Sequence, residues 1–427
     1  MKTSGIIVLK RCLATYENLN MSINSKYINK DDWNAVKAAR LFVGLYVLFT
    51  FISYLFTLFT HYYNGDFLMQ KCDLDFPLLT LNFILTIIPY FFIYYLYKYF
   101  KTKYHSKHYI PESGKIIENI TIILNVIYLF LVWKYSIGKA FADVYSAPPI
   151  ITLFIQILLR FSPNTWLGFS FFISKSKKKC ILFAIFLIFN AILTGYFGVF
   201  LALIFMTILK YNSYWIPFIK KHYIALILII FASSPIIEFG YDLRDTIRGT
   251  ESNASNLDGT TLLIGKFFGR LSPLSNTSMI LQREKVYKIE AEKLPTTFFV
   301  NSMLCVIYSG FKEEYPPEKI LSGSKAEDYV SFMCGTTGIL YFAAYKSWLS
   351  FCITLFLIVL MDILIFKVLS LFKFKLKYEV GLCLLMQPTM SGVGKEYFSI
   401  LWAFCIIFLI CATMHTITKK RIKTTHV

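Results

Sequence analysis

The sequence has 427 residues, of which 56% are hydrophobic, 18% aromatic and 16% charged, and its formal net charge is +19. A soluble globular domain has nearer a quarter of charged residues, so this composition favours a membrane protein. The basic residues stand in short clusters between apolar runs, which is the pattern that sets membrane orientation, and nucleic-acid binding is therefore not expected.

The apolar runs predict an all-α polytopic membrane protein of about ten transmembrane helices. Most runs approach the ~20 residues that cross ~30 Å of hydrocarbon, and they lack the alternation of an outer-membrane barrel. The stretch from Thr194 to Gly198 divides one long run, because glycine permits a tight reversal there. In chain order we expect helices at 41–60, 76–97, 116–133, 149–173, 180–194, 197–209, 223–237, 347–370, 380–391 and 397–416.

The lysines and arginines between these runs predict the orientation of the chain. One set of connections is rich in lysine, for example Lys98 to Lys107 and Lys373 to Lys377, and the other set has few. The lysine-rich side is expected to be cytoplasmic. The predicted organisation is therefore a cytoplasmic segment (1–40), helices 1–7 (41–237), a large periplasmic loop (238–346), helices 8–10 (347–416) and a cytoplasmic tail (417–427).

The large loop at 238–346 is long enough for a small subdomain. Its amphipathic stretches at 261–282 and 297–309 predict short helices that lie on the transmembrane bundle at the membrane interface. Cys305 and Cys334 fall where an oxidising compartment would matter, and free thiols are favoured over a disulfide between them.

Four arginines in the loop are candidates for binding an anion. The planar guanidinium group suits a bidentate grip on phosphate or carboxylate. Carboxylates, among them Glu238 and Asp242, stand close to the first two arginines, so the alternative is a solvated surface with weak ion pairs. The four are Arg244, Arg248, Arg270 and Arg283.

Arg160 lies about twelve residues into the apolar run that begins at Pro149. An arginine inside the membrane is costly, so it should face a cavity or a partner. Pro163 is expected to break or bend the helix there. The alternative is that 149–160 lies along the membrane surface. Two acidic residues in other apolar runs, Glu118 and Asp362, are predicted to be solvated at the cytoplasmic ends of their helices.

Several kinds of chemistry are not expected. None of the six histidines falls in the large loop, and no cluster of residues has the spacing of a zinc or magnesium site. There is no phosphate-binding glycine loop. We therefore predict that the protein uses no metal and no cofactor.

Three short stretches carry a resemblance to a known family. An arginine followed by Pro-Asn occurs in 160–165, a Leu-Thr-Gly turn between two helices in 192–202, and a Gly-rich re-entry into the membrane in 328–342. In this order they resemble the Wzy-type polymerases and O-antigen ligases of bacterial surface polysaccharide synthesis. Tyr196 and Phe197 replace the usual Ser-Arg of the turn, and Asp328 with its neighbour Glu327 stands where ligases have histidine, which favours the polymerase.

The resemblance implies a GT-C-like membrane glycosyltransferase in the bacterial inner membrane. It would join oligosaccharide repeat units carried on undecaprenyl diphosphate at the periplasmic face, with inversion and without metal or nucleotide sugar, and a Wzz-type chain-length regulator would be a partner. Arg160 and the four loop arginines would hold the diphosphates. The candidate bases are Glu238, Asp242 and Asp328.

Four other readings of the sequence stay open. The first is a flippase or another transporter of lipid-linked oligosaccharide, although no internal repeat of the transporter kind is visible. The second is the O-antigen ligase itself, which the absent histidine disfavours. The third is a membrane acyltransferase, and the fourth is a sensor or receptor without enzymatic activity.

Overall fold

The computed structural model describes residues 30–104, 114–135, 148–194, 198–232, 265–266, 268–323 and 332–424, and the single positions 235, 238, 239 and 242. Within these residues the regular structure is helical, with one isolated β-bridge between Tyr62 and Lys71. The elements are α2 (Lys30–Thr60), η1 (Gly65–Phe67), α3 (Phe76–Thr102), α4 (Gly114–Tyr135), α5 (Pro149–Arg160), α6 (Pro163–Ile173), α7 (Lys177–Thr194), α8 (Gly198–Lys210), α9 (Asn212–Ala232), α12 (Leu274–Gln282), α13 (Glu284–Glu292), α14 (Phe298–Leu304), η4 (Ser309–Phe311), α15 (Pro317–Ser322), α16 (Gly335–Lys346), α17 (Trp348–Ser370), α18 (Lys377–Ser391) and α19 (Gly394–Thr424).

Five of the described helices are long and apolar enough to cross a membrane, namely α2, α3, α4, α17 and α19. The number rises to seven if the bent pairs α5–α6 and α8–α9 each count as one span. The chain is therefore an all-helical polytopic membrane protein. Two helices at expected spans are short for a crossing of ~20 residues, since α7 has 18 residues and α18 has 15.

The two bent pairs differ from the expected spans. The run 149–173 is two helices that meet at an angle of 41°, because Ser162 adopts a left-handed backbone (φ 49°) and Pro163 begins α6. Helices α8 and α9 meet at 107°. Helix α9 begins at Asn212, well before the expected start at 223, and has a non-helical backbone at His222.

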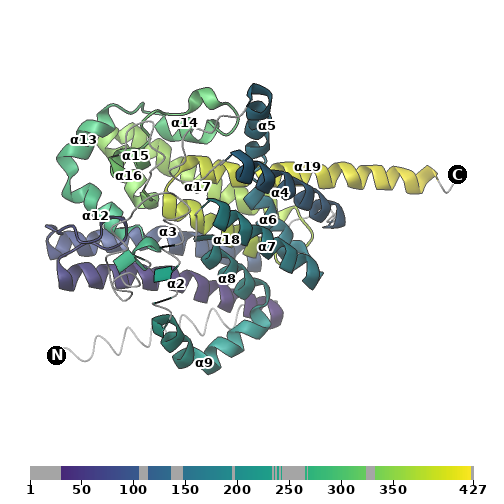
Figure 1. Ribbon diagram of the computed structural model, residues 1–427, viewed down its shortest axis with the longest axis horizontal. Helices are drawn as coiled ribbons and strands as arrows, with labels where there is room; N and C mark the ends of the chain where they lie inside the picture. The colour runs from purple at the N-terminus through teal and green to yellow at the C-terminus, as the bar shows by residue number, and fades with distance from the viewer. Residues whose placement is uncertain are drawn as a thin grey trace.

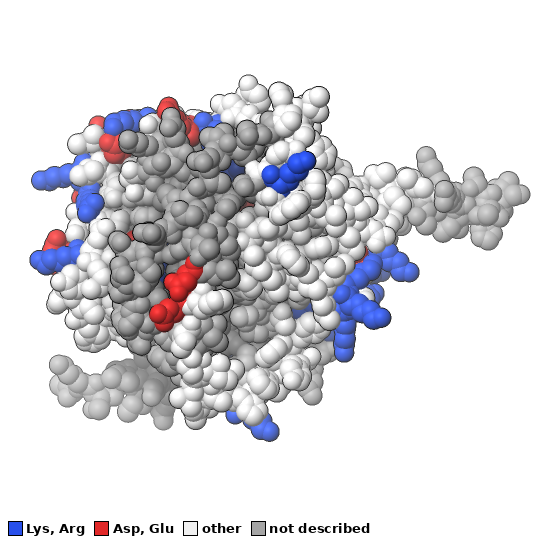
Figure 2. Space-filling model, in the orientation of Figure 1, with Lys and Arg blue, Asp and Glu red and all other residues white. Residues whose placement is uncertain are grey.

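The bundle has two ends that we name by their contents. At the loop end, α12 to α16 gather on the left of Figure 1, where α3 begins. At the lysine end, α3, α6, α8 and α17 finish and a group of lysines lines a cavity. With 27 residues, α3 separates the two ends by ~40 Å. Figure 2 shows charged side chains mainly over the left end and the lower right, and the described surface between them is mostly uncharged.

The loop helices do not all lie on the outside of the bundle. The prediction of surface helices fits α13, which buries Tyr287 and Ala291 and exposes Val286 and Ile289. It is wrong for α12, in which every residue from Leu274 to Ile280 is buried. Helix α12 packs against α3 and α16, and α16 in turn packs against α17 and α18. The loop thus supplies part of the protein core.

The prediction that Glu118 and Asp362 are solvated is also wrong. Glu118 is 7% exposed and forms an ion pair with Lys179, which lies in the first turn of α7. Asp362 is 2% exposed in the middle of α17, and its Oδ1 has no hydrogen-bond partner among the described residues. The position of these residues in the sequence does not predict their burial, because neighbouring helices cover both side chains.

Candidate functional site

The loop end brings together Arg270, Asp66 and Asn276 from two distant parts of the chain. Nη2 of Arg270 lies 3.1 Å from Oδ1 of Asp66. Nδ2 of Asn276 donates to Oδ2 of the same carboxylate at 3.0 Å and to the carbonyl of Met333 at 2.7 Å. The Asp66 side chain is 8% exposed, whereas that of Arg270 is 34% exposed. Asp66 therefore orients an arginine that a ligand can still reach.

Two glycines bring this pair together. Gly65 has a left-handed backbone (φ 67°), and a Cβ on it would lie 2.8 Å from the carbonyl oxygen of Gly269. A Cβ on Gly269 would lie 2.2 Å from the nitrogen of Gly65. Only residues without a side chain allow two backbones to approach so closely. Asp66 directly follows Gly65 and Arg270 directly follows Gly269, so the close approach of the two glycines brings the two charged side chains together.

Helix α12 carries a buried row of small polar side chains beside this pair. Asn82 of α3 donates through Nδ2 to Thr277 at 2.9 Å and to Ser278 at 2.8 Å. Its Oδ1 accepts a hydrogen bond from the hydroxyl of Tyr341 in α16 at 2.9 Å. The Oδ1 of Asn64 accepts from Ser275, and also from Ser53 in α2. These bonds tie α2, α3, α12 and α16 together, which fixes the position of Arg270 at the end of the bundle.

Arg283 lies at the far end of α12, and its environment is more open. Its Nη2 donates to Oε1 of Gln70 at 3.3 Å. The preceding residue, Gln282, accepts from the hydroxyl of Tyr63 at 2.6 Å and from the backbone nitrogen of Asp73 at 2.9 Å. The segment 61–75 thus contacts both predicted arginines, Arg270 through Asp66 and Arg283 through Gln70.

A second carboxylate near this face has an altered acidity. Burial, together with the neighbouring Glu396, raises the pKa of Glu318 to about 6. The carbonyl of Glu318 accepts from the backbone nitrogen of Phe332 at 3.1 Å, and the ring of Phe332 packs on Phe67, next to Asp66. A carboxylate with a pKa near neutrality can act as a general base. Glu318 therefore joins the candidates for that role.

Arg160 lies elsewhere, at the C-terminus of α5, where the helix breaks. It is half-buried, and Figure 1 shows α5 apart from α12. An apolar groove of about 290 Å³ runs between α4 and α5 beside it, with Phe154, Ile157 and Phe161 in its wall. The structure thus does not bring Arg160 together with Arg270 and Arg283. A half-buried cation next to an apolar groove matches the chemistry of a charged lipid.

The remaining predicted residues have a mixed outcome. Glu238 and Asp242 are both exposed. Three others, Arg244, Arg248 and Asp328, lie outside the described residues.

No group of three or more metal-ligating side chains occurs in the described part of the chain. Cys305 and Cys334 are free thiols, and Cys334 is buried.

Sequence reasoning missed Asp66, Asn276 and Glu318. Asp66 stands in a short connection that looks like an ordinary polar turn, and its partner Arg270 lies far along the chain. The one local signal is the pair of Gly-charged dipeptides, Gly65-Asp66 and Gly269-Arg270.

Comparison of the chain with known protein families, with curated proteins and with solved structures finds no match.

Proposed function

We propose that this protein is a polysaccharide polymerase of the membrane, a glycosyltransferase that joins oligosaccharide repeat units carried on undecaprenyl diphosphate. The observation that carries the proposal is the arginine pair at the loop end. Asp66 orients Arg270, which lies just before the buried helix α12, and Arg283 lies at the C-terminal end of α12. Guanidinium groups in this setting suit the oxygens of a diphosphate. The three sequence stretches that resemble Wzy-type polymerases support the same reading.

The chemistry requires a base and an anion site. The hydroxyl of the acceptor sugar attacks the anomeric carbon of the donor, the carbon–oxygen bond to the diphosphate breaks, and the configuration inverts. A carboxylate takes the hydroxyl proton, and Glu318 suits this role because its pKa is about 6. Arg270 and Arg283 neutralise the charge that develops on the leaving diphosphate. Positioning of the two substrates supplies much of the remaining rate.

The proposal includes the finer topology. Ten crossings of a GT-C-like fold, in the inner membrane of a bacterium, result when α7, α8, α9 and α18 each cross once and the bent pair α5–α6 forms one crossing. The lysine end faces the cytoplasm, as do both termini, and residues 238–346 face the periplasm. Arg160 and the groove between α4 and α5 accommodate the head and the first isoprene units of a lipid carrier. A Wzz-type chain-length regulator would act beside it.

A genetic test separates this function from its rivals. Deletion of a polymerase gene leaves cells with a single repeat unit on the lipid core, whereas deletion of a ligase or flippase leaves none. Complementation with Arg270→Gln should restore membrane insertion but not the polymer ladder, and Lys293→Gln, at an exposed position on the same loop, should restore both. A full ladder in the Arg270→Gln strain contradicts the proposal.

A flippase or another transporter is the second candidate, and one observation favours it. Asp362 lies buried in the middle of a membrane-spanning helix, where an ionisable residue often marks a proton or substrate path. The two bent helix pairs are a further feature of transporters. Purified protein in liposomes distinguishes the two. Polymer formed from lipid-linked repeat units supports the enzyme, and transfer of the intact lipid between leaflets without polymer supports the transporter.

A further inference from the structure

A cavity of about 470 Å³ opens at the lysine end of the bundle, opposite the site described above. Five helices and two connections form its wall: the first part of α2, the ends of α3, α6 and α8, the start of α9, and the connections α6–α7 and α17–α18. Five lysines line it, and none of the described residues in its wall is an aspartate or glutamate. The lysines are Lys101, Lys175, Lys210, Lys373 and Lys375.

Two of these lysines are fixed by contacts that also hold the helix ends together. Nζ of Lys101 lies 2.9 Å from Oε1 of Glu379 and donates to the carbonyl of Lys375 at 3.1 Å. Nζ of Lys210 donates to the carbonyls of Phe171 and Ser174 at the end of α6. Among the described residues, the carboxylate of Glu379 pairs with Lys101, and that of Glu118 pairs with Lys179.

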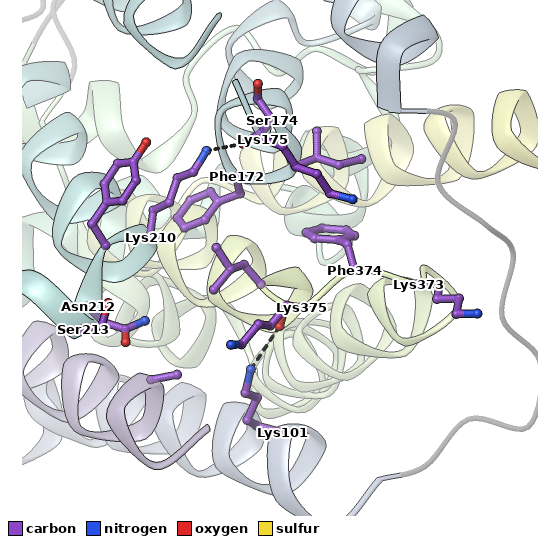
Figure 3. Close-up of a pocket in the computed structure, with 14 residues that line it drawn as sticks. Lys101, Phe172, Ser174, Lys175, Lys210, Asn212, Ser213, Lys373, Phe374 and Lys375 are labelled. Atoms are coloured by element: carbon purple, nitrogen blue, oxygen red, sulfur yellow. Dashed lines mark hydrogen bonds between the residues drawn. The ribbon is translucent and has the colours of Figure 1, made fainter. Parts of the chain in front are cut away.

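Figure 3 shows how these groups surround the cavity. Lys101 and Lys375 lie together on one side, and Lys175 and Lys210 lie on the other. The rings of Phe172 and Phe374 stand between the two pairs. The fifth lysine, Lys373, extends away from the rest. The wall therefore combines positive charge with aromatic surface.

The start of α9 adds a second feature that favours an anion. Asn212 and Ser213, the first residues of this helix, line the cavity. The N-terminus of a helix carries partial positive charge and unpaired N–H groups, both of which attract phosphate. The hydroxyl of Ser213 offers one more donor. Lysine side chains and the positive end of α9 therefore meet at the same cavity.

We propose that this cavity binds the phosphate of an anionic membrane lipid. The spans α3 and α17 end at the cavity, so it lies at the level of lipid headgroups. The aromatic and aliphatic wall suits the glycerol and upper acyl carbons of a lipid better than a fully hydrated ion. Basic pockets between membrane helices bind such headgroups by the same physics. The proposal is independent of the reaction at the loop end.

Lipid retention tests the proposal on the full chain. The protein is purified in detergent with equal amounts of phosphatidylglycerol and phosphatidylethanolamine, and bound lipids are counted by native mass spectrometry. We expect at least fivefold selectivity for phosphatidylglycerol. Because one lysine near an anionic lipid is worth about a fivefold change in affinity, Lys175→Gln/Lys375→Gln should lose roughly 25-fold. The matched variant Lys285→Gln/Lys288→Gln changes two exposed lysines of α13 at the loop end and should retain full binding.

Three outcomes overturn the proposal. The first is equal retention of both lipids by the wild-type protein, a result that does not depend on whether any variant folds. The second is binding of glycerol phosphate as tight as that of phosphatidylglycerol, which would identify a soluble phosphate ligand. Glycerol phosphate that binds at least tenfold more weakly supports a lipid. Unchanged binding in Lys175→Gln/Lys375→Gln would also contradict it, provided that the variant elutes as the wild-type protein does in gel filtration.

Discussion

Arg270 and Asp66 form an ion pair at 3.1 Å in which one partner is buried and the other is one-third exposed. The asymmetry matters because the carboxylate has two donors in the protein, Arg270 and Asn276, while the guanidinium group still faces solvent. The buried carboxylate holds an arginine whose side chain is still 34% exposed, so an incoming anion can reach it. The pair therefore links the stability of the loop end to its proposed chemistry.

Asp66→Asn should lower the stability of the protein in detergent by about 1–3 kcal/mol. The substitution leaves Arg270 without its buried counter-charge and one donor of Asn276 without a charged acceptor. Thermal unfolding monitored by intrinsic fluorescence measures the loss. The control is Asp73→Asn, whose ion pair with Lys71 is exposed on both sides (73% and 58%) and is worth about 0–1 kcal/mol. Equal effects of the two substitutions would contradict the prediction.

Gly269→Ala should prevent the normal contact between the two segments. The new Cβ would meet the backbone nitrogen of Gly65, which cannot move aside as a side chain can, so the cost should reach at least the ~1–3 kcal/mol of an overpacked core. The matched control is Gly44→Ala on an exposed face of α2, where a Cβ meets nothing within 4 Å. Alanine there should stabilise the helix by about 0.5–1 kcal/mol. Unfolding temperatures that rise in both variants would refute the steric argument.

Glu318 predicts a specific dependence of stability on pH. Its pKa is about 6 in the folded protein and 4.5 when unperturbed, so the folded state binds more protons between these two values. Stability contributed by this group is therefore present below about pH 4.5 and is lost as the pH rises to about 6, by roughly 2 kcal/mol. Glu318→Gln should remove this slope. Glu314→Gln, an exposed neighbour, should retain it.

The same residue makes a prediction for activity, which rests on the proposed function. If the carboxylate of Glu318 is the base, glycosyl transfer by the wild-type protein should increase as the pH rises through about 6. Glu318→Gln should lower the rate by 10²-fold or more. A rate profile of Glu318→Gln that matches the wild type in height and shape would assign the base to another residue.

Asn82→Ala should destabilise the helix bundle by about 1–3 kcal/mol, since it deprives Thr277, Ser278 and Tyr341 of their buried partner. Asn125→Ala is the comparison within a membrane helix, because the Asn125 amide donates to the carbonyl of Thr121 one turn away and its side chain has no hydrogen bond to a second helix among the described residues. Resistance to limited proteolysis within the loop measures the difference. We expect faster cleavage in Asn82→Ala and unchanged cleavage in Asn125→Ala.

The membrane helices could be predicted well where one long apolar run forms one helix. The expected 76–97, 116–133 and 347–370 correspond to α3, α4 and α17 within a few residues. Hydropathy is a property of a local window, so it finds such helices. It missed the extension of α2 back to Lys30, where Ala35, Val36 and Ala39 pack against neighbours in spite of charged residues around them.

The candidate site could be predicted only in part. Arg270 and Arg283 stood out because arginine has few roles in an apolar chain. Asp66 and Glu318 did not, because their significance depends on contacts with residues far away in the sequence. The buried polar helix α12 was likewise mistaken for a surface helix. Its composition indicates that it is amphipathic, but only the tertiary arrangement shows that other polar groups cover its polar face.

The bond between Asn82 and the loop has a consequence for how the chain is made. Asn82 is synthesised 195 residues before Thr277 and 259 residues before Tyr341, its partners. At about 5–20 residues per second, a ribosome needs roughly 10–50 seconds to bridge these distances. During that interval α3 is in the lipid with an amide that has none of its final partners. The bundle can therefore close only late in synthesis, and a chaperone or insertase would need to shelter α3 until then.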